Sequence, residues 1–280
     1  MRSHLYTKAQ RRASRISAYL CELVGMTLVL FNALGWACWN YGVGSPIGQW
    51  IPDRSLRTLL QAICAATGTA IVVYSPLGKR AGGHLNPATT LAFWLLNKIS
   101  TRDALIYILM QLLGAFLGTL LVWIAFPDLV QSIHGGTTVL SQGISPGLGF
   151  GLELGMTFIL MLMVLAMVNS RWMRRTGMIS SALFILLYIS GAKLTGVSLN
   201  PVRSLAPAAL IMFWENQWIY WIAPLLGAAL AVLVYRQGVV GTGKSYCCKL
   251  YHPFDISCHH ARCGYSNPTY IDDFSRHLSQ

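Results

Sequence analysis

Two six-residue passages, 114 positions apart, constrain the fold of this chain more than any other feature. Residues 83–88 read Gly-His-Leu-Asn-Pro-Ala, and residues 197–202 read Val-Ser-Leu-Asn-Pro-Val. Proline suits the first turn of a helix because it lacks an amide proton, and the asparagine before it is a good helix cap. Each passage is therefore predicted to be a loop that leads into the N-terminus of a short helix.

The composition indicates an integral membrane protein. Of the 280 residues, 54% are hydrophobic and only 11% are charged, and the mean hydropathy is +0.51. This is too apolar for an ordinary soluble domain. The net charge of +12 comes from basic residues that cluster between apolar runs and in both tails. That placement fits membrane topology, so the expected surroundings are a lipid bilayer and no nucleic-acid partner is expected.

Six apolar runs reach the length of about 20 residues that a membrane-spanning helix needs. They cover approximately 17–40, 56–77, 103–126, 147–169, 177–193 and 216–236. The apolar runs after Pro87 and Pro201 are too short to cross, and are expected to be half-helices. Irregular backbone at membrane depth survives only where protein buries it or water lines it, so the two loops indicate a pore or a binding site.

Lysine and arginine are concentrated in alternate connections. They are frequent in residues 1–16, around the first half-helix and between the fourth and fifth spans, and absent from 127–146. The positive-inside rule therefore predicts a multi-pass protein with both termini in the cytoplasm, and the expected location is the cell membrane. The first Asn-Pro loop is then cytoplasmic and the second external. The expected division is an N-terminal segment 1–16, a channel domain 17–236 and a cytoplasmic tail 237–280.

An internal duplication is visible in the apolar runs. Glu22 opens Glu-Leu-Val-Gly-Met-Thr in the first span, and Glu153 opens Glu-Leu-Gly-Met-Thr in the fourth. Each repeat, about 17–126 and about 147–236, holds three spans and one half-helix, and an odd number of spans inverts the second repeat. The two half-helices then present their positive N-terminal ends near the midplane, which disfavours cations. The amides of Asn86 and Asn200 can donate to a small uncharged solute.

These motifs resemble the major intrinsic protein family of aquaporins and glycerol facilitators, over roughly residues 17–236. The resemblance rests on two Asn-Pro motifs, the arginine after the second one, and the paired glutamates. The motif residues are Asn86, Pro87, Ala88, Asn200, Pro201 and Val202, with Arg203 following. The resemblance implies an all-α fold of six transmembrane helices and two re-entrant half-helices. It also implies a homotetramer with one pore per subunit, no cofactor and no catalysed reaction.

By spacing from the asparagines, the resemblance implies a narrow filter formed by Ala66, Tyr188, Val197 and Arg203. Only the arginine matches the residues typical of water-selective members, and Val202 departs from the usual alanine. The expected function is passive passage of water, with other small uncharged solutes left open. A wider facilitator of glycerol, urea, ammonia, peroxide or metalloid acids is the alternative. An ion-coupled secondary transporter, which also uses broken helices, is a third option.

Three groups of ionisable residues have more than one interpretation. Glu22 and Glu153 can relay protons, but the resemblance implies that they hold the loop backbone by hydrogen bonds. His84 can gate by protonation or simply line the cytoplasmic entrance. The tail has enough thiols and imidazoles for a Zn²⁺ or Cu⁺ site, against a disordered reduced tail or acylation of Cys247 or Cys248. The tail candidates are Cys247, Cys248, His252, Cys258, His259, His260 and Cys263.

One further motif favours an enzyme but lacks the structure that it needs. Residues 238–245 satisfy the P-loop pattern, which requires a strand before it and an α/β domain around it. Here the pattern follows a membrane span, so a linker is the preferred interpretation and no enzymatic activity is expected.

Overall fold

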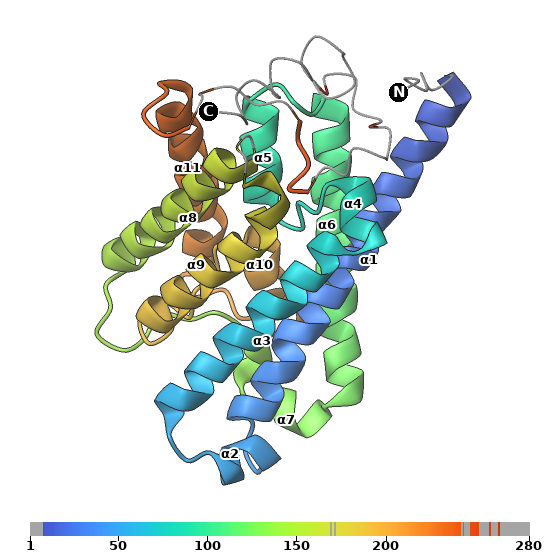
Figure 1. The fold of residues 1–280 in the computed structure, drawn as a ribbon. Helices are drawn as coiled ribbons and strands as arrows, with labels where there is room; N and C mark the ends of the chain where they lie inside the picture. Colours follow the sequence, from blue (N-terminus) through green and yellow to red (C-terminus); the bar gives the residue numbers. More distant parts are fainter. Residues whose placement is uncertain are drawn as a thin grey trace.

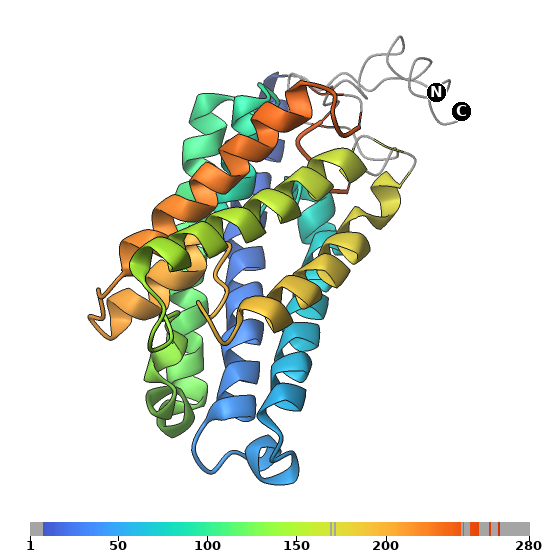
Figure 2. The ribbon, with the colours of Figure 1, turned by 90° about the vertical axis from the view of Figure 1, so that its left-hand side faces the viewer.

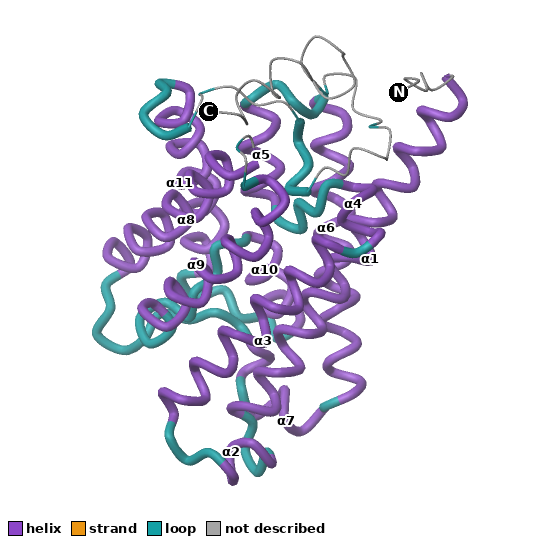
Figure 3. Tube along the Cα trace, in the orientation of Figure 1, coloured by secondary structure: helices purple, strands orange, loops and turns teal. Residues whose placement is uncertain are grey.

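A computed structural model describes residues 8–168, 170, 172–241, 243, 247–251, 258 and 263. Within these residues all regular secondary structure is helical (Figure 3). Six long helices are α1 (Lys8–Tyr41), α3 (Arg54–Tyr74), α6 (Thr101–Ala125), α8 (Pro146–Val168), α9 (Thr176–Gly191) and α11 (Gln217–Arg236). Two short helices, α5 (Pro87–Leu95) and α10 (Pro201–Leu210), follow the Asn-Pro motifs. The predicted fold class is confirmed.

Short helices fill the connections between these elements. They are α2 (Pro46–Trp50), α4 (Pro76–Ala81), α7 (Pro127–Ser132) and the 3₁₀ turns η1 (His134–Gly136) and η2 (Met173–Arg175). Five described helices are long and apolar enough to cross a membrane. The remaining predicted span, 177–193, corresponds to α9, which has only 16 residues. It ends early because the chain turns at Gly191, whose carbonyl accepts from the N–H groups of Leu194 and Thr195.

Side-chain caps fix where several helices begin. The Asp53 carboxylate accepts from the first N–H groups of α3, and Ser100 caps α6. Asn86 caps α5 and Asn200 caps α10, each followed by proline in the first turn. These caps satisfy N–H groups that have no partner inside the helix.

The two repeats pack their first and last helices closely through glycines. A Cβ added at Gly114 or Gly118 of α6 would lie only 2.3 Å and 2.6 Å from backbone oxygens of α1. In the second repeat, a Cβ at Gly227 of α11 would lie 2.4 Å from the carbonyl oxygen of Leu154 in α8. Small residues let helix backbones approach at this distance. The α1–α6 and α8–α11 pairs are therefore equivalent structural units.

Each half-helix is held by both repeats. Helix α5 packs against α6 of its own repeat and against α11, and α10 packs against α11 and against α6. Helix α1 begins and α11 ends at the same end of the bundle, whereas α2 and α7 lie at the opposite end (Figures 1 and 2). This arrangement brings the two Asn-Pro loops together inside the molecule.

The outer surface of the bundle is apolar, as a lipid environment requires. Helix α6 shows a stripe of exposed leucines at spacings of four residues, which is one face of a helix. The stripe consists of Leu105, Leu109, Leu113, Leu117 and Leu121. Its polar residue Gln111 instead points into the protein and is fully buried.

Candidate functional site

The two Asn-Pro loops are bound to each other through their asparagines. The Asn86 Nδ2 atom donates to the carbonyl oxygen of Leu199 at 2.8 Å, and Asn200 Nδ2 donates to the carbonyl oxygen of Leu85 at 2.9 Å. The oxygen of each amide caps its own helix, through Ala88 N at 2.8 Å and Val202 N at 3.3 Å. Each amide has two N–H groups, so one remains for another acceptor.

The loop backbone before each asparagine has an unusual conformation. Gly83, Leu85, Val197 and Leu199 have φ angles of +68°, +50°, +50° and +53°. A left-handed conformation costs a residue with a side chain about 1–2 kcal/mol. Such conformations persist only where the surrounding structure holds them in place, and they are concentrated at functional sites.

A buried glutamate supports the first loop. Glu22, which is fully buried, accepts from the backbone N–H of His84 at 3.0 Å and of Leu85 at 2.8 Å. Its second oxygen also accepts from Gln111 Nε2 at 2.7 Å. These bonds satisfy N–H groups that the irregular backbone would otherwise leave unpaired.

Glu153 supports the second loop in the same way. It is also fully buried, and it accepts from the N–H groups of Ser198 and Leu199, each at 3.0 Å. The Thr195 hydroxyl donates to the same carboxylate at 2.7 Å. The described residues that line the neighbouring cavities include neither glutamate, an arrangement that favours the structural role over a proton relay.

Two cavities meet between the repeats. A vestibule of about 600 Å³ lies toward α2 and α7 and is lined by residues that include Arg54, His134 and Lys193. A central cavity of about 180 Å³ is lined by both asparagines, Asn86 and Asn200. Tyr188 and Arg203 line both cavities. The boundary between the two spaces is therefore at these two side chains.

The structure brings together the four residues of the predicted filter. Ala66, Tyr188, Val197 and Arg203 all line the central cavity. The Arg203 Nη1 atom donates to the carbonyl oxygen of Gly136 at 3.1 Å, which fixes the guanidinium. Among the described residues that line this cavity, Arg203 is the one lysine, arginine or carboxylate.

The remaining motif residues shape the protein around the cavity. Pro87 and Pro201 occupy the first turns of α5 and α10. Ala88 is fully buried, and Val202 is 3% exposed and packs in a cluster with Ala206. Val202 does not line either cavity, so its departure from alanine affects packing.

No sequence pattern predicted the contact between the tail and the first loop. The His84 ring lies 3.1 Å from Thr90 Oγ1 through Nδ1 and 2.7 Å from the Cys248 carbonyl oxygen through Nε2. Leu250 lines the central cavity. The interpretation of a disordered tail therefore does not fit residues 247–251, because apolar and hydrogen-bonded contacts hold them against the helices.

The structure tests part of the predicted tail site. The sulfur atoms of Cys247, Cys258 and Cys263 lie within 4.8 Å of one another, and Cys248 is not in this group. His252, His259 and His260 lie outside the described residues. Cys247 and Cys248 are buried, which disfavours their acylation.

Comparisons with known proteins agree with this architecture. Residues 9–235 match the family model described as Major intrinsic protein. The chain is 36% identical over 245 residues to the lens fiber major intrinsic protein of Gallus gallus, covering 84% of this chain and 86% of the relative. It is 34% identical over 225 residues to aquaporin TIP4-2 of Zea mays, covering 79% and 84%.

A solved structure shows the same fold. The aquaglyceroporin of Plasmodium falciparum superposes with a TM-score of 0.67 at 22% sequence identity, covering 79% of this chain and 95% of that one. Six long helices, two half-helices and a lined path between them define a membrane-channel architecture. The matched family model then shows that this chain belongs to the major intrinsic protein family.

Proposed function

We propose that this protein is a passive membrane channel for water and small uncharged solutes, driven only by their gradients. The observation that carries the proposal is the path formed by the vestibule and the central cavity, which meet at Tyr188 and Arg203 beside both Asn-Pro loops. The named relatives, which include an aquaporin, support it.

Hydrogen bonding along the path lets water pass without binding tightly. The loop residues between Gly83 and Leu85, and between Val197 and Leu199, line the central cavity, and each asparagine keeps one N–H group for a passing oxygen. A solute thus exchanges hydrogen bonds with water for hydrogen bonds with the protein.

Charge at the same place excludes ions and protons. The N-termini of α5 and α10 meet at the cavity, and each carries about half a positive charge. Arg203 adds a full positive charge where the two cavities join. A cation that loses its hydration there gains no compensating negative group.

The width of the filter decides which solutes pass. Ala66 contributes little bulk to the central cavity, which favours the wider facilitator of glycerol, urea, ammonia, peroxide or metalloid acids as a second candidate. Tyr188 restores bulk at the boundary with the vestibule. Water is the preferred solute because Tyr188 and Arg203 narrow the path together.

Stopped-flow light scattering on proteoliposomes distinguishes the two candidates. The experiment compares shrinkage under an impermeant osmolyte with re-swelling under glycerol or urea, for the wild type and for Ala66→Phe. Ile63→Phe is the matched control, because Ile63 lies on the same helix but is exposed on the outer surface.

Fast shrinkage without re-swelling supports a water channel. Fast re-swelling that Ala66→Phe abolishes and Ile63→Phe preserves supports the facilitator. A flux that saturates and depends on an ion gradient would replace the channel with a coupled transporter. No response to any osmolyte would contradict the proposal.

The proposed setting is the cell membrane, with residues 1–16 and the tail 237–280 in the cytoplasm and a channel domain over residues 17–236. The proposed assembly is a homotetramer with one pore per subunit, and no reaction is catalysed. Native mass spectrometry from detergent tests the assembly, since a monomer or dimer as the largest species would contradict it.

A further inference from the structure

Residues 247–251, here called the tail segment, are bound to the first Asn-Pro loop and to α4. The Leu250 N–H donates to the Gly82 carbonyl oxygen at 2.9 Å, and the Cys248 carbonyl oxygen lies 2.7 Å from His84 Nε2. The Lys249 ammonium donates to the carbonyl oxygen of Lys79 at 2.9 Å. The tail segment thus contacts the backbone that forms one end of the central cavity.

The side chains of the tail segment extend this contact to the cavity itself. Leu250 lines the central cavity together with Gly83 and His84. The Tyr251 ring packs edge-on against Tyr74, with ring centres 5.3 Å apart. With the tail segment in this position, the apolar side chain of Leu250 lies at one end of the path and narrows it for water.

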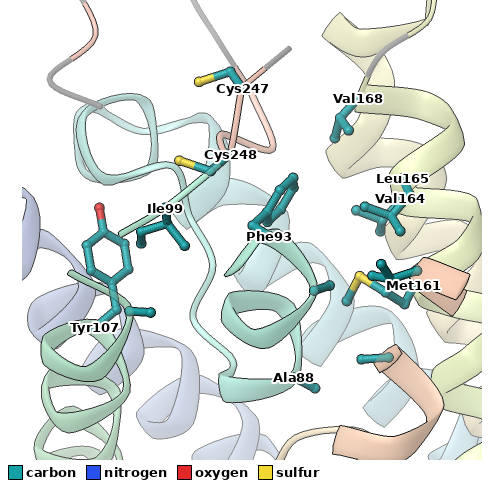
Figure 4. Close-up of a cluster of buried hydrophobic side chains, with 14 of the residues drawn as sticks. Ala88, Phe93, Ile99, Tyr107, Met161, Val164, Leu165, Val168, Cys247 and Cys248 are labelled. Atoms are coloured by element: carbon teal, nitrogen blue, oxygen red, sulfur yellow. The ribbon is translucent and has the colours of Figure 1, made fainter. Parts of the chain in front are cut away.

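Three thiols gather beside the tail segment. The sulfur atoms of Cys247, Cys258 and Cys263, here called the thiol cluster, lie within 4.8 Å of one another, and those of Cys247 and Cys258 are 3.7 Å apart. Cys247 and Cys263 are buried. Cys247 and Cys248 lie at the end of α5 that carries Phe93 (Figure 4).

The chemistry of the cluster selects one class of ion. Thiolate sulfur is a soft ligand that prefers Cu⁺ or Zn²⁺ to hard cations such as Mg²⁺ and Ca²⁺. Three sulfurs suffice for Cu⁺, and Zn²⁺ can complete a tetrahedron with a water molecule. A cytoplasmic tail keeps its thiols reduced and available for a metal.

We propose that the thiol cluster binds a Cu⁺ or Zn²⁺ ion and that this binding holds the tail segment at the end of the path, closing the channel. The proposal rests on the proposed channel function for its second half only. Metal binding is a property of the cluster and can be measured without transport.

Metal binding is coupled to the position of the tail segment through Cys247. This residue belongs to the tail segment, and its sulfur lies near the other two when the segment is docked, that is, bound to the first Asn-Pro loop. A ligand shifts a conformational equilibrium toward the state that it binds more tightly. Metal at 100 times its dissociation constant would raise the ratio of docked to undocked tail about 100-fold, if the undocked tail does not bind it.

The binding half is tested on the full-length protein in detergent with a non-thiol reductant. Zn²⁺ and, separately, Cu⁺ are titrated against a chromogenic chelator, and Co²⁺ is added to report thiolate ligation through its charge-transfer absorption. We expect one ion per chain, lost in Cys258→Ser and in Cys263→Ser. Cys64→Ser is the matched control, because Cys64 lies in α3 outside the cluster, and it should bind as the wild type does.

The closure half is tested by water permeability in proteoliposomes loaded with metal on both faces. We expect metal to slow the wild type and a chelator to restore it, with no effect on Cys258→Ser. Leu250→Ala should still bind the metal yet remain conductive, because it keeps the cluster and removes the side chain at the end of the path. A chain ending at Gly243 should conduct water with or without metal.

The outcomes separate this proposal from the proposed function. Equal metal binding by the wild type and Cys258→Ser, or no saturable binding of either ion, would overturn the site. Stoichiometric binding that leaves wild-type permeability unchanged would overturn the closure. If the chain ending at Gly243 and the metal-free wild type both conduct no water, the channel function itself fails, while the binding result stands.

Discussion

The two Asn-Pro loops share one framework but are covered by different parts of the chain. In the first repeat, Tyr107 donates to the Ala81 carbonyl oxygen at 2.7 Å, and in the second Tyr220 donates to that of Thr195 at 2.8 Å. Residues 81 and 195 differ by the same 114 positions as the two asparagines. The framework is therefore repeated down to single hydrogen bonds.

The segments that cover the two loops come from different parts of the chain. A Cβ added at Gly82 would contact Lys249 of the tail segment at 3.2 Å, and one added at Gly196 would contact Thr138 at 3.6 Å. The second loop is covered by the connection between α7 and α8, within the channel domain. The first is covered by residues 247–251, which follow α11, the last helix in the part of the chain that the structure describes.

The comparison also shows which repeat supplies the positive charge at the central cavity. Arg203 of α10 and Thr89 of α5 occupy equivalent positions, 114 residues apart, and both line the central cavity. Of these two side chains, only Arg203 in the second repeat carries a guanidinium. Equivalent frameworks thus carry one guanidinium at the second loop and, at the first loop, a cover that comes from beyond α11.

Removing the glutamates is the severest test of the shared framework. Glu22→Leu and Glu153→Leu each leave two backbone N–H groups and one side-chain donor without an acceptor. An unpaired buried donor costs about 1–3 kcal/mol, so each variant should lose about 3 kcal/mol or more. Thermal unfolding in detergent measures the loss.

The control for this pair is Glu215→Leu, because Glu215 is exposed between α10 and α11. It should unfold within about 0.5 kcal/mol of the wild type. If Glu153→Leu loses about 3 kcal/mol or more while Glu22→Leu is as stable as the control, the two loops are not supported in the same way.

Much of this framework could be predicted from the sequence, because it depends on local patterns. The two Asn-Pro motifs predicted the caps and the half-helices, and the apolar runs predicted six long helices. The duplicated glutamate motif placed Glu22 and Glu153 at corresponding positions. Each of these features has a spacing or a residue type with a direct structural cause.

The rest depends on contacts that leave no pattern. Leu250 is one leucine in a polar tail, and nothing in its neighbours indicates that it reaches the central cavity. The short helices α2, α4 and α7 have five or six residues, too few for a helical period. The direction of Tyr188 depends on how α9 packs, which spacing along the chain does not determine.

Replacing each asparagine by alanine tests the hydrogen bonds between the two loops. The expected loss of stability is smaller than that of the glutamate variants. Asn86→Ala removes the cap of α5 and leaves the Leu199 carbonyl oxygen without that donor, and Asn200→Ala does the same for α10 and Leu85. Each should cost about 1–2 kcal/mol, measured by thermal unfolding.

The double variant shows whether the two loops act as a unit. Residues that share a network show coupling energies of about 0.5–3 kcal/mol in double-mutant cycles. We expect the double variant to lose less than the sum of the single losses, because each single change already loosens the opposite loop. Strict additivity would mean that each asparagine stabilises only its own helix.

The smallest expected effect compares Gly83 with Val197, which occupy equivalent positions in the two loops and both have positive φ angles. Gly83 has φ +68° and Val197 has φ +50°, and glycine adopts this region at little cost. Gly83→Ala should therefore lose about 1 kcal/mol, with an added contact of 3.3 Å to Val73.

At position 197 the glycine variant should be more stable than the alanine variant, which reverses the usual order of the two residues. Val197→Gly and Val197→Ala both remove a buried side chain, but only the alanine keeps the left-handed strain. We expect the glycine variant to unfold at the higher temperature, by an amount corresponding to about 1 kcal/mol. An alanine variant as stable as the glycine variant would show that the second loop relaxes when Val197 is removed. Its backbone conformation would then depend on that side chain, whereas in the first loop glycine adopts it unaided.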